Sequence, residues 1–125
     1  MSVPFRHFTT PDLFGAPVQV EFRWIQNGIA IRHADTVDVK FELVSEGQRE
    51  EKILALPHPV LLRVSSETGH PITDPWCSRL AALHLRYMME TGDDLEKPLV
   101  TLTAEQIARY AEQLKAELTQ ANDFV

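Results

Sequence analysis

The chain is poor in the features that mark membrane-bound or disulfide-rich secreted proteins. Its 125 residues include one cysteine, which excludes an internal disulfide and agrees with a reducing compartment. No apolar run approaches the roughly 20 residues that a membrane-spanning helix needs. The N-terminal residues 1–6 also lack the apolar stretch of a signal peptide. We therefore expect a cytoplasmic protein that does not bind a membrane.

Concentrated positive charge is also missing. Twelve lysines and arginines stand against 18 acidic residues, which gives a formal net charge of −6. The basic residues form no cluster that would follow a line of phosphates, so nucleic acid is not an expected partner. The acidic run over 93–96 follows a predicted helix end, where a solvated loop is a simpler interpretation than a cation site.

Length and composition indicate one globular domain. The chain is 44% hydrophobic and 24% charged, as ordinary folded proteins are, and it is too short for two ordinary domains. We expect a single domain over 18–125, preceded by an extended aromatic arm over 1–17. We favour packing of the arm on its own domain over reaching a partner, because three phenylalanines are a large apolar area to leave in water.

The clearest local signals surround the segment 75–91. Asp74 is placed to accept hydrogen bonds from the first helical turn, Pro75 fits the first helical position, and Gly92 suits the left-handed conformation that ends a helix. Apolar side chains cover most of the circumference between these signals, so this helix must be covered on several sides. We predict that it is the central helix of the core.

Two further helices are predicted on either side of it. The segment 59–68 ends at Gly69, which favours a helix, although its apolar run would also suit a strand. The helix over 103–121 begins with Thr103 and Gln106, which match the capping-box pattern. Its apolar residues form a single stripe, so this helix is expected on the surface of the core.

Residues 18–56 alternate between apolar and polar side chains, as half-buried strands do. Phe22 and Trp24 fall on one face, and Asn27-Gly28 is typical of a two-residue hairpin turn. We predict four strands whose loops set the following pairs opposite each other: Trp24 and Ile31, Phe22 and His33, Arg32 and Asp38, Phe41 and Ile53, Glu42 and Lys52. In this register the third and fourth predicted strands are joined by the three-residue loop Glu46-Gly47-Gln48.

The predicted fold class is α+β. A four-stranded antiparallel meander over about 18–56 carries its apolar face against the helices over 59–68, 75–91 and 103–121. A short extended segment over 99–102 separates the last two helices. The solvent-exposed face of the meander is expected to carry opposite charges that neutralise one another.

Side chains of metal-binding type are predicted near the start of the central helix. His58, His70, Cys77 and His84 would together supply the ligand atoms of a tetrahedral zinc site. Their spacing matches no standard zinc signature, so we expect no metal and no cofactor.

Cys77 is also a candidate nucleophile. It falls in the first turn of its helix, where free amides and the helix dipole lower the pKa of a thiol. His58 or His70 would act as the base, and the helical spacing sets Asp74 and His84 on the same side as Cys77. The simpler interpretation is that Cys77 is a buried packing residue.

His84 stands among apolar residues in the middle of the central helix. The ordinary explanation is a neutral core histidine, hydrogen-bonded to a carboxylate or a backbone carbonyl. Burial would then lower its pKa, whereas pairing with a buried carboxylate would raise it. Both alternatives stay open at this point.

The sequence favours a small cytoplasmic interaction or regulatory module that self-associates, as a homodimer, or binds a protein partner. This expectation rests on the sheet with one apolar face and on the aromatic arm. The alternative is a small enzyme or metal-binding protein that uses His58, His70, Cys77 and His84, with Asp74 beside them. Elemental analysis and thiol titration would separate the two.

Overall fold

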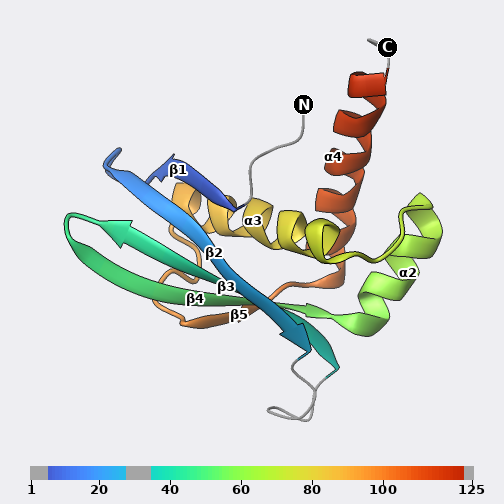
Figure 1. Cartoon of the computed structure of the whole chain (residues 1–125), viewed down its shortest axis with the longest axis horizontal. Helices are drawn as coiled ribbons and strands as arrows, with labels where there is room; N and C mark the ends of the chain where they lie inside the picture. The colour runs from blue at the N-terminus through green and yellow to red at the C-terminus, as the bar shows by residue number, and fades with distance from the viewer. Residues whose placement is uncertain (1–5, 28–34, 123–125) are drawn as a thin grey trace.

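The computed structural model describes residues 6–27 and 35–122, which form one five-stranded sheet and three helices (Figure 1). The strands, in both chain order and sheet order, are β1 (His7–Pro11), β2 (Pro17–Asn27), β3 (Thr36–Ser45), β4 (Gln48–Pro57) and β5 (Leu99–Thr101). The helices are α2 (His58–Thr68), α3 (Asp74–Thr91) and α4 (Ala104–Asn122). The α+β class, the antiparallel meander and the helices on one face of the sheet are confirmed.

The first four strands are antiparallel and the fifth is not. β5, within the extended segment predicted over 99–102, lies parallel to β4, and α2 and α3 form the connection between them. β1 comes from the segment predicted as an arm and pairs with the first residues of β2. Phe8 of β1 packs against the core and Thr10 is buried.

Asn27, predicted as the first residue of a hairpin turn, is instead the last residue of β2 and pairs with Val37. Gly28 and the strand predicted over 29–33 lie outside the described residues, with the pairings of Ile31, Arg32 and His33. In the described part of the chain, β2 pairs directly with β3, and Trp24 lies opposite Lys40.

The predicted register between β3 and β4 is wrong by one residue. Only Glu46 and Gly47 separate the two strands, and both have positive φ, 51° and 80°, as a two-residue hairpin turn of the primed type requires. Phe41 therefore lies opposite Lys52 instead of Ile53. Because side chains alternate along a strand, this shift moves Lys52 to the inner face, which the helices cover. Ile53 moves to the opposite face of the sheet, which we call the open face.

A β-bulge changes the direction of Trp24. The pairing of β2 with β3 passes from Phe22 opposite Phe41 to Trp24 opposite Lys40, which leaves Arg23 as an extra residue. An extra residue reverses the alternation of side chains beyond it. The expectation that Trp24 shares a face with Phe22 is therefore wrong, since Trp24 lies on the open face.

The core lies between the inner face of the sheet and the helices. Phe41, Leu54, Leu80, Leu85 and Met88 are fully buried there. α3 contributes residues from most of its circumference, because the sheet and α4 pack against it (Figure 1). The prediction of a central helix covered on several sides is confirmed.

Local signals specify the helix ends. The Thr103 hydroxyl accepts a hydrogen bond from the Gln106 amide at 3.2 Å, and the Gln106 side chain accepts one from the Thr103 amide at 2.9 Å, so the predicted capping box is confirmed. The cap of α3 is Thr73, whose side chain accepts a hydrogen bond from the Trp76 amide, and not Asp74. Asp74 lies inside the first turn, where its charge complements the helix dipole.

Candidate functional site

The candidate metal ligands are engaged separately. Among the described residues, no group of three or more His, Cys, Asp and Glu side chains is arranged to hold a metal ion. His58 Nδ1 lies 3.3 Å from Asp35 Oδ2 at the start of α2. The His70 ring stacks on Trp76, with centroids 5.3 Å apart and an angle of 14° between the planes. These contacts anchor the two ends of α2 and form no common site.

Cys77 is a packing residue in this structure. Its side chain is almost completely buried, and this burial, with the nearby charge of Asp74, raises the pKa of the thiol to about 12. A nucleophilic cysteine needs the opposite shift, because the thiolate is the reactive form. The covalent-catalysis interpretation therefore has no support in the environment of Cys77.

His84 is buried between α3 and α4. Its Nδ1 lies 2.8 Å from the hydroxyl oxygen of Tyr110, so the partner is a hydroxyl group and not the expected carboxylate or backbone carbonyl. Burial lowers the pKa of His84 below its ordinary value of 6.5, and the charges of Asp94 and Asp93 only weaken this effect. A neutral imidazole is the form that this environment favours.

Acid should therefore destabilise the protein through His84. Because the folded-state pKa is lowered, the unfolded chain binds more protons below about pH 6.5, and stability falls from there until the folded pKa is passed. His84→Gln should flatten this slope. Urea unfolding midpoints of both proteins at pH 5.5 and pH 7.5 measure the effect.

Tyr110→Phe is the matched control for this experiment. It removes the hydrogen bond but keeps the buried imidazole, so it should lower the midpoint at both pH values and retain the slope. A larger stabilising contribution of His84 at pH 5.5 than at pH 7.5 would show that the histidine is charged in the folded state.

The open face of the sheet carries a row of four side chains that crosses it from β2 to β5. Trp24 lies opposite Lys40, Lys40 opposite Ile53, and Ile53 opposite Leu99. All four are half-buried, and the Lys40 ammonium lies 5.5 Å from the centre of the Trp24 ring. We call this set the apolar row, because the Lys40 stem adds its methylene groups to the three apolar side chains.

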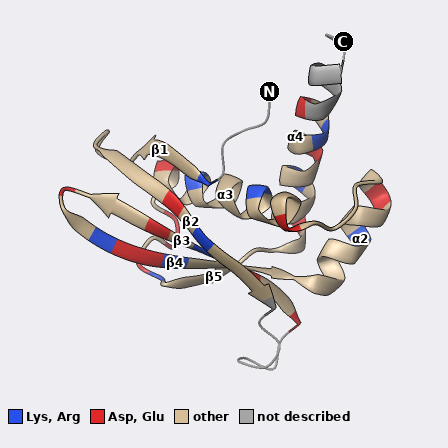
Figure 2. Ribbon diagram, in the orientation of Figure 1, with Lys and Arg blue, Asp and Glu red and all other residues tan. Residues whose placement is uncertain are grey.

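Acidic and basic residues are interspersed along β2, β3 and β4 (Figure 2), and those beside the apolar row are paired with one another, as expected for the face turned to solvent. Arg23 contacts Glu21 at 3.2 Å and Glu42 at 2.8 Å, and Arg49 also contacts Glu42. The hydrogen bond with Glu42 raises the pKa of Arg23, and the same bond lowers the pKa of Glu42. Lys40 pairs with Glu51. This part of the face therefore presents little net charge to a partner.

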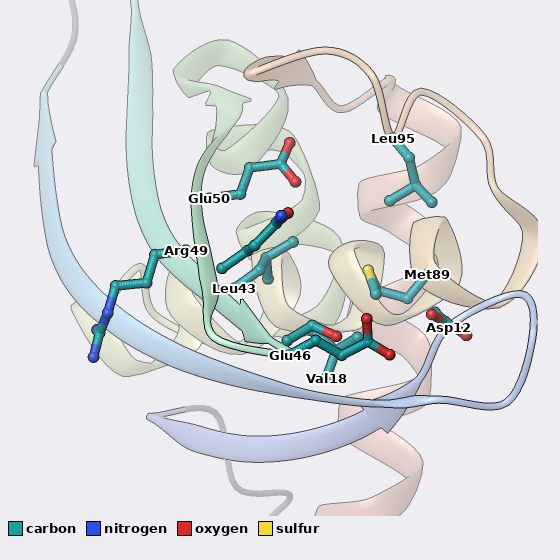
Figure 3. Close-up of a pocket in the computed structure, with 10 residues that line it drawn as sticks. Asp12, Val18, Leu43, Glu46, Arg49, Glu50, Met89 and Leu95 are labelled. Carbon is teal, nitrogen blue, oxygen red and sulfur yellow. The ribbon is translucent and has the colours of Figure 1, made fainter.

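A cavity of about 260 Å³ opens at the β3–β4 hairpin, on the inner side of the sheet (Figure 3). Its apolar lining comes from the sheet, α3 and the following loop: Val18, Leu43, Met89 and Leu95. Its acidic lining consists of Asp12, Glu46 and Glu50. Arg49 belongs to the wall but extends away from the cavity in Figure 3, toward its contact with Glu42.

Lys52 lies beside this cavity and is the residue that sequence reasoning missed. It is 1% exposed, it donates hydrogen bonds to the carbonyl oxygens of Leu95 and Lys97, and it pairs with Glu50 at 3.0 Å. The predicted register placed Lys52 on the solvent-exposed face of the sheet. The signal that would have corrected it is Glu46-Gly47, read as a complete two-residue turn.

Comparison with known proteins gives no match: no family model, no curated protein and no solved structure is significantly similar to the chain. None of the helices in the described segments combines the length and apolarity needed to cross a bilayer. The function is therefore inferred from the geometry of the open face and the cavity.

Proposed function

We propose that the chain is a small cytoplasmic interaction module that self-associates through the open face of its sheet, as a homodimer. The observation that carries the proposal is the apolar row, which places Trp24, Ile53 and Leu99 in line across the sheet. Among the described residues, none of these three belongs to the buried core or to the apolar side chains that pack against it. Large apolar side chains aligned on a surface are typical of an interaction site.

A second copy suits this face because the face is electrically balanced. Two copies related by a twofold axis present the same charges to each other, so a face with net charge would repel its copy. Here Arg23, Lys40 and Arg49 are paired with glutamates within each chain. Two such faces can pack about 10 Å apart, as sheets do in a sandwich.

The size of the face is below that of a standard protein interface. Ten-residue strands about 33 Å long and spaced about 4.8 Å apart give the three long strands a face of at most roughly 500 Å² in projection. Thr36, Asp38 and Ala55 share this face but are buried within the chain, so the surface free for a partner is smaller. Stable interfaces commonly bury about 800 Å² on each partner, so this face belongs with weak, transient contacts, and we propose association in the micromolar range.

Trp24→Ser should shift the protein toward the monomer. The substitution removes the largest apolar side chain of the row, and interface tryptophans commonly contribute 2 kcal/mol or more, which weakens association by roughly 30-fold. Sedimentation velocity between about 1 and 200 μM, a range chosen to bracket the expected micromolar constant, measures the change.

Leu62→Ser is the matched control, because Leu62 is 54% exposed on α2, outside the sheet. It should leave the association unchanged. A wild-type protein that stays monomeric up to 200 μM would contradict the proposal, as would equal weakening by both substitutions.

A further inference from the structure

The turn between β1 and β2 holds Phe14 in an exposed position. The Asp12 carboxylate accepts hydrogen bonds from the amides of Phe14 at 2.8 Å and Ala16 at 2.9 Å. The backbone adds bonds between Asp12 and Ala16 and between Gly15 and Asp12, and Gly15 takes the positive φ that closes the turn. Phe14 is nevertheless 93% exposed. The hydrogen bonds therefore order the backbone that presents this aromatic side chain to solvent.

This turn also rests on the end of α3. A Cβ on Gly92, the residue that ends α3, would lie 2.7 Å from Cδ1 of Leu13, so the Leu13 side chain occupies the space that the glycine leaves. Asp12 of the same turn lines the cavity. The backbone of Phe14 is thus held in place next to a cavity-lining residue, so little backbone entropy is lost when a partner covers the ring.

The chemistry of the cavity selects its occupant. Val18, Leu43 and Met89 offer an apolar wall, while Asp12, Glu46 and Glu50 bring three carboxylates. The nearby Lys52 ammonium pairs with Glu50, and Arg49 turns to the other face of the sheet, so negative charge remains in excess. A long cationic side chain matches both parts, because its methylene stem packs on apolar surface while its head stays near the carboxylates.

We propose that the cavity and the turn over 12–16 form a docking site for a short basic segment of another protein. An arginine or lysine of that segment enters the cavity, and an apolar neighbour packs on Phe14. A second copy of this chain is a poorer occupant, because in a twofold contact the carboxylates of its own cavity would face the carboxylates of this one. The cavity lies on the inner side of the sheet, so docking there leaves the open face available for self-association.

Nuclear magnetic resonance of the full chain tests this site directly. With ¹³C-labelled methionine methyl groups, the Met89 signal reports on the cavity and the fully buried Met88 signal reports on the core. The probe is an acetylated, amidated five-residue peptide with arginine between two leucines, and the matched peptide has glutamate in place of arginine. The arginine peptide should shift the Met89 signal and leave Met88 in place, and the glutamate peptide should bind roughly tenfold more weakly or not at all.

Two substitutions separate docking from general attraction to an acidic protein. Glu46→Gln should weaken binding of the arginine peptide by about threefold, as for a partly exposed ion pair, and Phe14→Ser should weaken it further. Glu105→Gln removes the same charge from an exposed position on α4 and should have no effect.

Equal binding of the two peptides, or equal weakening by Glu46→Gln and Glu105→Gln, would overturn the proposal. An unmoved Met89 signal at saturating peptide would do the same. A Met89 signal that moves with protein concentration alone, and equally in the Trp24→Ser variant, would show that a second copy occupies the cavity, which also contradicts the proposed partner.

Discussion

Replacing Phe41 with alanine is expected to lower the free energy of unfolding by about 3–5 kcal/mol, the largest effect that we predict. Phe41 is fully buried on the inner face of the sheet, and its ring meets Phe22 edge-on, with centroids 6.1 Å apart and planes at 77°. Truncation removes this contact and leaves a void in the core. Since domains of this size are stable by about 5–15 kcal/mol, the loss is a large fraction of the total.

Urea unfolding measures this loss. For a slope near 2 kcal/mol per molar, the midpoint of Phe41→Ala should fall by roughly 2 M. Phe41→Leu refills most of the volume and should lose less than half as much stability. A Phe41→Ala midpoint equal to that of the wild type would show that Phe41 is not in the core, and hence that the register of β3 is wrong.

Lys52→Met should cause the second-largest loss, about 1–3 kcal/mol. Methionine keeps the unbranched stem in the buried position but removes the ammonium, so the carbonyl oxygens of Leu95 and Lys97 lose their common donor. Relief from burying a charge offsets part of the cost. Glu50, whose side chain is 60% exposed, can be hydrated after its partner is gone. The loop that leads to β5 should then open more often.

Unfolding midpoints and limited proteolysis of the loop over 92–98 check this expectation. Lys97→Met is the matched control, since the same change is made on a side chain that is 57% exposed, and it should alter stability by less than about 0.5 kcal/mol. If Lys52→Met were as stable as the wild type, with no faster cleavage of the loop, Lys52 would not be the residue that fastens the loop to the sheet.

The helices could be predicted from the sequence because their signals are local. Thr103 and Gln106 bond to each other across one turn, and Gly69 and Gly92 each end a helix with positive φ. Such contacts form between residues a few positions apart, so the local amino-acid sequence is enough to specify them.

The strand registers were harder, because each depends on a single residue. The count of loop residues at Glu46-Gly47 decides whether Lys52 faces the core or water, and the extra residue at Arg23 decides the same for Trp24. Both alternatives satisfy the alternation pattern. The opposite-charge pair Glu42 with Lys52 favoured the wrong register. In the observed register Glu42 lies opposite Glu51, and Glu51 pairs diagonally with Lys40.

The candidate sites were the least predictable. The cavity is lined by the β1–β2 turn, β2, β3, the β3–β4 hairpin, α3 and the loop after it, and the sequence does not show that these segments meet. His58, His70, His84 and Cys77 were candidates by residue type alone, and the structure gives each a separate packing or hydrogen-bonding environment.

The parallel position of β5 also determines when the sheet can be completed during synthesis. β3 and β4 can pair as soon as β4 has left the ribosome, whereas β5 must wait for α2 and α3. Until then the outer edge of β4 is open to other nascent chains. β5 pairs with β4 only from Ile53 onward. The preceding part of β4, which β5 does not cover, carries four consecutive charged residues, from Arg49 to Lys52. The late strand therefore covers the part of β4 that charge does not protect from aggregation.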